Sequence, residues 1–170
     1  MDATPGQFER AQDAQAAALA WKYLAFALGQ EEYCLPVLKV REIIKVMDIT
    51  QVPQVPANVR GVINLRGKVI PVIDLRLKFE FPAQDYTERT CIIVVEVSRS
   101  QANVMMGIVV DSVSEVLNIA GADIDLAPDF GGHVTTDYVM ALAKVKGTVK
   151  ILLDLDRVLD ADTRVAARAS

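Results

Sequence analysis

Short apolar runs separated by polar turns organise most of the chain. The first run covers residues 21–28, a turn follows at 29–32, and residues 33–40 form a second run that contains Pro36. Short runs with β-branched and aromatic members predict strands, and a proline inside a strand indicates an edge or a bulge. We therefore expect an antiparallel strand pair from residue 21 onward.

A second strand pair is expected further along the chain. Residues 59–65 predict a strand, which turns at 66–68 and returns over 69–73. Gly67 can supply the positive φ angle that a tight hairpin needs. Asp74 follows directly and precedes a short stretch of helix-forming residues. An aspartate at this position predicts the N-cap of a short helix.

Residues 59–79, which hold this hairpin and helix start, recur at a constant shift of 80 positions. Residues 139–159 share five identities in 21 positions with residues 59–79, where average composition would give roughly one or two. Such a period indicates duplication of one structural unit. We place the two units at about residues 21–82 and about 90–160, and we leave open an exchange of strands or helices between them.

The strand pattern predicts the fold class. Each unit contains about five short strands joined by short turns, which is typical of a small antiparallel barrel. A unit of about 60 residues is marginal alone because it buries a small share of its surface. We therefore expect a mostly β fold of two barrels that share a third apolar cluster at their junction, with a groove on each side of that cluster.

The two ends of the chain differ from this pattern. Residues 1–20 are rich in Ala and Gln, which favour helix but offer little apolar surface to bury. We expect them to form a mobile or helical extension, since chain ends are usually poorly ordered. Residues 161–170 are expected to form a C-terminal tail.

Composition excludes several classes of function. The net charge is −4 and the pI about 5.0, whereas a nucleic-acid-binding surface needs a basic stripe. His133 is the single histidine, and Cys34 and Cys91 match no zinc or disulfide spacing. We expect no metal and no cofactor. Without a signal peptide or a long apolar run, the chain is expected to be cytoplasmic.

Candidate catalytic groups are few. His133 lies in a glycine-containing loop, and neither a nucleophile nor an orienting partner is recognisable near it in the sequence. Asp74, Asp111 and Asp154 follow apolar strands, where helix caps or turns account for them more readily than catalysis does. We therefore predict a protein that is not an enzyme, and a hydrolase that uses His133 with an aspartate remains the weaker alternative.

Several segments resemble one known family. Residues 61–79, GVINLRGKVIPVIDLRLKF, closely resemble the signature of the CheW-type chemotaxis coupling proteins, as do residues 23–44, 107–119 and 151–159. The resemblance covers about residues 21–160. It implies two SH3-like five-stranded β-barrels around a shared core. It also implies a non-enzymatic scaffold that bridges the tips of chemoreceptors to the histidine kinase CheA in arrays, with contacts to other CheW copies as a further expectation.

The resemblance also suggests site residues. Those that match the receptor-binding positions of the family are Val40, Glu42, Arg66 and Val113. Residues expected to be structurally sensitive near interfaces are Gly61, Asn64, Leu65, Gly67 and Gly107. Kinase contacts in the family come from barrel ends, which we do not assign to residues. The alternatives are a coupling protein for a paralogous system, such as one controlling pilus motility or development, and a small-barrel nucleic-acid binder.

Overall fold

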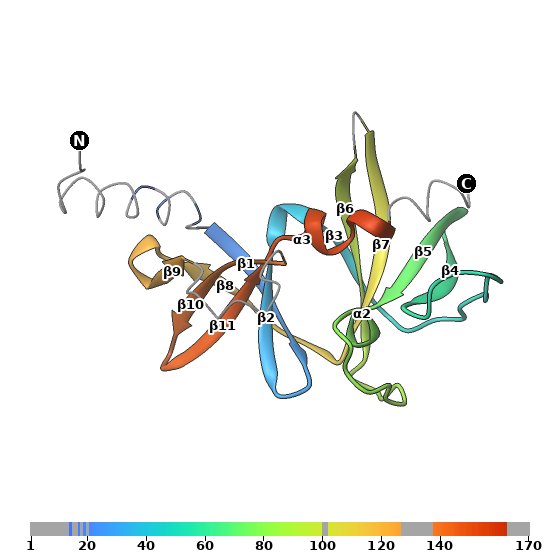
Figure 1. The fold of residues 1–170 in the computed structure, drawn as a ribbon, viewed down its shortest axis with the longest axis horizontal. Coiled ribbons are helices and arrows are strands. Elements are labelled where there is room, and N and C mark those ends of the chain that lie inside the picture. The colour runs from blue at the N-terminus through green and yellow to red at the C-terminus, as the bar shows by residue number, and fades with distance from the viewer. Residues whose placement is uncertain are drawn as a thin grey trace.

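The computed structural model describes residues 14, 17, 19, 21–99, 102–126 and 138–162. Within these residues the fold is mostly β, with short helices at the ends of two strands, as the pattern of short apolar runs predicted. Two sheets lie side by side, and α3 (Leu155–Val158) is at their junction (Figure 1). Residues 14, 17 and 19 are helical. The rest of the N-terminal extension, His133 and residues 163–170 of the tail lie outside the described residues.

The two sheets have distinct strand orders. Sheet A runs β8 (Ser112–Ile119), β1 (Trp21–Leu28), β2 (Glu31–Pro36), β11 (Thr148–Leu153), β10 (Val139–Val145) and β9 (Ile124–Leu126). Sheet B runs β3 (Val40–Lys45), β6 (Cys91–Arg99), β7 (Ala102–Val110), β5 (Lys68–Asp74) and β4 (Val59–Leu65). Neighbouring strands are antiparallel except β2 with β11 and β5 with β7, which are parallel.

Each sheet combines strands from both repeats. The β1–β2 hairpin, from the first repeat, is inserted between β8 and β11 of the second repeat. The β6–β7 hairpin, from the second repeat, is inserted between β3 and β5 of the first. The sheets therefore do not coincide with segments 21–82 and 90–160, because the two repeats exchange a hairpin.

The strand expected over residues 33–40 is interrupted. β2 ends at Pro36, the 3-10 turn η1 (Val37–Lys39) follows, and β3 begins at Val40. Proline has no backbone N–H to continue a ladder, so a strand can end there at little cost. The chain uses this break to leave sheet A and enter sheet B.

The hairpins and helices that end the two repeats match closely. The β4–β5 and β10–β11 turns each have two residues with positive φ, near 50° and 81–87°, which is the geometry of a type I′ turn. The short helix α2 (Leu75–Lys78) is capped by Asp74, which accepts a hydrogen bond from the Arg76 N–H at 3.0 Å. Asp154 caps α3, as the sequence predicted, and accepts a hydrogen bond from the Arg157 N–H at 3.2 Å.

Three hydrophobic clusters stabilise the molecule. One lies within sheet A and includes Leu117 and Leu152, and one lies within sheet B and includes Ile70 and Val94. The third and largest takes side chains from both sheets and from both helices. The predicted apolar cluster at the junction is thus confirmed, and it joins the two sheets into one body.

Neither cysteine forms a disulfide. The Cys34 side chain is buried in the sheet A cluster, and burial raises the pKa of its thiol to about 12. Cys91 is half-buried at the start of β6. Among the described residues, no group of three or more His, Cys, Asp or Glu side chains could hold a metal ion. In the same part of the chain, no helix is long and apolar enough to span a membrane.

Candidate functional site

The structure brings together Arg66 and Glu42, which come from opposite edges of sheet B. Arg66 lies in the β4–β5 turn, and Glu42 lies on β3. The Arg66 Nη1 donates to Glu42 Oε1 at 3.0 Å, and Nη2 donates to Oε2. A planar guanidinium that meets both carboxylate oxygens forms a strong and oriented pair. Because this pair joins the two edges, it also helps to close sheet B into a barrel.

The Arg66–Glu42 pair is displayed at the surface. The Arg66 side chain is 70% exposed and that of Glu42 is 31% exposed. The hydrogen bond from Arg66 lowers the pKa of the Glu42 carboxyl, and the positive charge of Arg66 adds to the effect. The same bond raises the pKa of Arg66. Both groups are therefore held ionised where a partner can reach them.

The turn that carries Arg66 is fixed by its neighbours. Arg66 has a φ of 50°, which is uncommon for a residue with a Cβ, and Gly67 has a φ of 87°. Asn64 Oδ1 accepts a hydrogen bond from the Gly67 N–H at 2.9 Å. Leu65 packs against the sheet B cluster. Asn64, Leu65 and Gly67 thus support the position of the arginine.

Val40 and Val113 lie in different sheets. Exposure alternates along β3, so Val40 shares the more buried face with Glu42, as the spacing predicted. Val113 lies on β8 of sheet A, opposite Phe26. Both valines are half-buried and pack against the central cluster. Glu42 and Arg66 therefore contact one another directly, whereas the two valines are linked through the cluster that they both border.

Packing accounts for Gly61 and Gly107. Gly61 has a φ of 140°, and a Cβ there would collide with the backbone carbonyl of Thr50, which pairs with Val62. A Cβ at Gly107 would lie 2.8 Å from the Cγ2 of Ile92. Close packing alone would therefore make a substitution at either position costly, without any contact with a partner.

A second pair, which sequence reasoning did not assign, occupies the equivalent place in sheet A. Lys146, in the β10–β11 turn, lies 3.8 Å from the Glu115 carboxylate on β8, with side chains 77% and 48% exposed. Residues 40–43, VREI, resemble residues 113–116, VSEV, and this resemblance was the signal that could have identified the pair. This pair is longer and more exposed than the Arg66–Glu42 pair.

A groove of about 600 Å³ lies beside the Lys146–Glu115 pair. Its lining includes Glu32 and Lys150, which form an ion pair, and the Ser114 hydroxyl lies 3.3 Å from Glu32 Oε1. In sheet B, Ile70 takes the place of Lys150. Met105 takes the place of Glu32, because it precedes Gly107, the partner of Val72, by two residues, as Glu32 precedes Cys34, the partner of Leu152. Both replacements are apolar. The two barrel ends therefore differ in chemistry.

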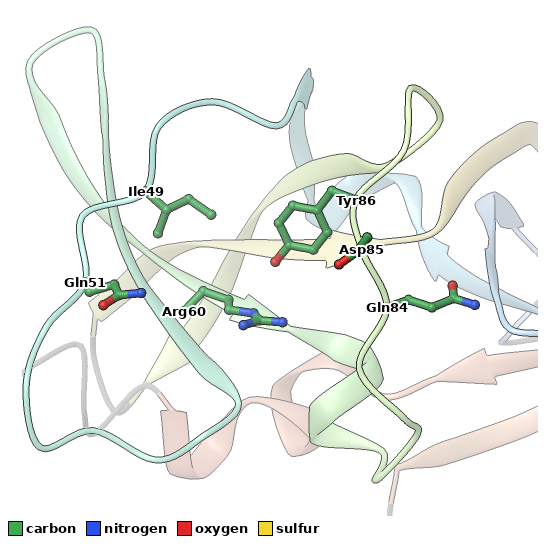
Figure 2. Close-up of a pocket in the computed structure, with 6 residues that line it drawn as sticks. All are labelled: Ile49, Gln51, Arg60, Gln84, Asp85 and Tyr86. Carbon is green, nitrogen blue, oxygen red and sulfur yellow. The ribbon is translucent and has the colours of Figure 1, made fainter.

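A pocket of about 280 Å³ lies beside β4, and Figure 2 shows the side chains around it. The Arg60 Nε and Nη2 atoms are each 3.2 Å from Asp74 Oδ2, and the guanidinium lies 5.7 Å from the centre of the Tyr86 ring. Burial raises the pKa of Tyr86, and Asp74 adds to the shift. Asp74 is the ion-pair partner of Arg60. Through Tyr86, this network anchors residues 79–90, which connect α2 to β6.

Comparisons with known proteins agree with this architecture. The model of the CheW-like domain matches residues 22–163. A chemotaxis protein CheW from Klebsiella aerogenes is 37% identical over 141 residues, which is 83% of this chain and 82% of that protein. Protein FrzA from Myxococcus xanthus is 29% identical over 150 residues, covering 86% of this chain and 91% of FrzA.

Similarity extends to solved structures. The crystal structure of the scaffolding protein TtCheW from Thermoanaerobacter tengcongensis matches with a TM-score of 0.73 and 32% identity, covering 84% of this chain and 94% of that one. The fold is accordingly two SH3-like subdomains around a shared core. The matched family model spans both sheets and the residues of the candidate site. The chain therefore belongs to the CheW-like family.

Proposed function

We propose that this protein is a non-enzymatic scaffold that couples the cytoplasmic tips of chemoreceptors, the methyl-accepting chemotaxis proteins, to the regulatory domain of the histidine kinase CheA. Membership of the CheW-like family supports this proposal. In this role the protein is cytoplasmic and is recruited to membrane-associated receptor arrays, where it also meets further copies of itself.

The proposed receptor-binding site consists of Val40, Glu42, Arg66 and Val113. The apolar stripe of a receptor helix packs against the two valines, while Arg66 and Glu42 set its register through polar contacts. The observation that carries this proposal is the exposed, oriented Arg66–Glu42 pair. A signal passes only where two receptor states make different contacts with this surface.

Charge reversal at Arg66 tests the proposed site. We expect Arg66→Glu to weaken binding of a receptor cytoplasmic fragment by about tenfold or more, because it places a second carboxylate beside Glu42. Arg66→Lys keeps the charge but loses the planar fork, so its loss is about two- to fivefold. Isothermal titration calorimetry measures both affinities.

Lys146→Glu provides the matched control, because Lys146 occupies the equivalent turn of the second repeat. It makes the same charge change at the other barrel and is expected to leave receptor binding unchanged. Receptor binding by Arg66→Glu at the wild-type level would remove Arg66 from the site. An equal loss in the two variants would indicate an effect of net charge alone.

Similarity to FrzA favours a second candidate function, a coupling protein for a paralogous chemosensory system that controls another process. Binding assays distinguish the two, with fragments of the receptors and the kinase regulatory domains that are encoded beside this gene. Preferential binding to chemotaxis receptors supports the first proposal. Preferential binding to the receptor of another system supports the second.

A further inference from the structure

Within the described residues the chain passes between the two sheets at two points. Lys39 ends η1, which joins β2 of sheet A to β3 of sheet B. Asp111 is the one residue between β7 of sheet B and β8 of sheet A. Val40 follows Lys39 directly, and Val113 follows Asp111 by two residues. Each valine of the proposed receptor site thus lies within two residues of a crossing.

The first crossing is ion-paired to α3. The Lys39 Nζ lies 3.1 Å from Asp156 Oδ2. The other oxygen of Asp156 accepts a hydrogen bond from the Ser98 N–H, near the end of β6, at 3.1 Å. Both charged side chains are half-buried. Asp156 therefore joins a helix that follows sheet A to two segments that lead into or belong to sheet B.

The second crossing is ion-paired to α2. The Arg76 Nη1 lies 3.0 Å from Asp111 Oδ2. The same oxygen accepts a hydrogen bond from the Gly29 N–H, in the β1–β2 turn, at 2.8 Å. This contact joins a helix that follows sheet B to a crossing and a turn of sheet A. We call these two sets of contacts the Lys39 clasp and the Asp111 clasp.

The two clasps are equivalent in position and opposite in charge. Arg76 and Asp156 are separated by the 80 positions of the repeat, yet one is a cation and the other an anion. Their partners are inverted as well, Asp111 in one case and Lys39 in the other. If each helix met the crossing of its own repeat, Arg76 would face Lys39 and Asp156 would face Asp111. Like charges repel, so the pattern favours the exchanged arrangement.

We propose that the two clasps fix the placement of one sheet relative to the other and thereby position Val40 and Val113 for the partner. Asp156 and Asp111 are positioning residues in this scheme, acting through the crossings beside the valines. The effect on partner affinity rests on the proposed function, whereas the placement of the sheets does not.

The Lys39 clasp is the better one to test because conservative variants are available. Asp156→Asn keeps an oxygen for the Ser98 N–H but removes the charge that holds Lys39, and Lys39→Met keeps the aliphatic stem. Asp156→Glu keeps the negative charge. Arg157→Gln is the matched control, since Arg157 is the next residue of α3 and pairs with Asp154, the N-cap of that helix.

Two measurements on the full chain decide the proposal. Spin labels at positions 69 and 149, which are exposed valines in sheets B and A, report the distance between the sheets by pulsed electron resonance in a Cys91→Ser background. Calorimetry reports the affinity for the receptor cytoplasmic fragment. We expect Asp156→Asn and Lys39→Met each to broaden the distance distribution and to weaken binding about two- to fivefold. The double variant, Lys39→Met with Asp156→Asn, should show no broader distance distribution and no weaker binding than either single variant.

The outcomes separate the clasp from the proposed function. The clasp is supported if Asp156→Glu and Arg157→Gln both keep the wild-type distance distribution and the wild-type affinity for the receptor fragment. An unchanged distance distribution in Asp156→Asn and Lys39→Met overturns it. If the wild-type protein fails to bind the receptor fragment, the proposed function is wrong, and the distance measurement alone still decides whether the clasp places the sheets.

Discussion

Glu42 and Arg66 show how two exposed side chains can be held in one geometry. The turn forces Arg66 into a positive φ, Asn64 holds the turn, and the carboxylate of Glu42 receives the guanidinium. The family resemblance suggested both residues as members of the proposed receptor site. Their contact could not be derived from local pattern, because it depends on how the two edges of sheet B approach one another.

The pKa of Glu42 provides the first prediction. In Arg66→Met the pKa of the Glu42 carboxyl should rise toward the ordinary value for glutamic acid, because the hydrogen bond from Arg66 lowers it in the wild-type protein. The pair therefore contributes stability that is present above the ordinary pKa and is lost as pH falls through the lowered value. An NMR titration of the side-chain carboxyl measures the change, and an identical pKa in both proteins would contradict it.

Two glycines lead to a second prediction. Gly61→Ala should destabilise the protein by about 3 kcal/mol or more, because the residue has a positive φ and its Cβ would meet the backbone of Thr50. Gly107→Ala should cost less, about 1–3 kcal/mol, because the obstacle is the movable side chain of Ile92. Urea unfolding compares the two, and the reverse order would show that the β4 backbone can move.

At the scale of elements, local signals identified the hairpins and the caps. Gly67 predicted the turn between β4 and β5, and Asp74 predicted the start of α2 because both effects act within a few residues. Pro36 predicted an edge or a bulge within a strand, but the sequence alone did not show that β2 ends there. The exchange of hairpins depends on pairings such as Tyr33 with Ile151, which no local pattern encodes.

A third prediction concerns the link between α2 and the helical residues after α3. The Lys78 Nζ lies 2.9 Å from Asp162 Oδ2, and both side chains are largely buried, while Asn58 donates to Asp162 Oδ1 at 2.8 Å. Lys78→Met leaves a buried carboxylate without its cation, which should cost about 3–5 kcal/mol. Thermal unfolding measures the loss.

The control for this prediction is Arg157→Gln, which removes a surface pair between the exposed Arg157 and Asp154, the N-cap of α3. Such pairs contribute about 1 kcal/mol or less, so the melting temperature should change little. Equal effects of the two variants would mean that the Lys78–Asp162 pair gains nothing from its burial.

At the scale of the whole molecule, the duplication was visible in the sequence but its assembly was not. The strand content and the shared central cluster could be predicted from the repeats, because the first follows from the apolar pattern and the second from the small size of each unit. Which hairpin pairs with which sheet is decided by contacts between distant segments. The inverted charges of Arg76 and Asp156 favour the exchanged assembly. The sequence alone does not reveal this, because the structure is needed to identify Asp111 and Lys39 as their partners.

A fourth prediction follows from the exchange. Fragments 21–86 and 87–162 should each be unfolded alone, because β3 and β5 lose the β6–β7 hairpin that lies between them and β8 and β11 lose β1–β2. Mixed in equal amounts, they should recover a folded complex. Amide proton chemical-shift dispersion reports both states. A well-dispersed spectrum from either fragment alone would show that a repeat folds without its exchanged hairpin.

The exchange of hairpins also has a consequence for synthesis on the ribosome. Sheet B receives its central strands only after Val110 has emerged, and sheet A waits for Leu153, the end of β11. The β1–β2 hairpin is therefore made early, and its two outer edges stay unpaired until β8 and then β11 have been translated. Contacts between such distant segments form slowly. The nascent chain thus exposes unpaired strand edges during its synthesis, and we expect chaperones that act at the ribosomal exit tunnel to bind it.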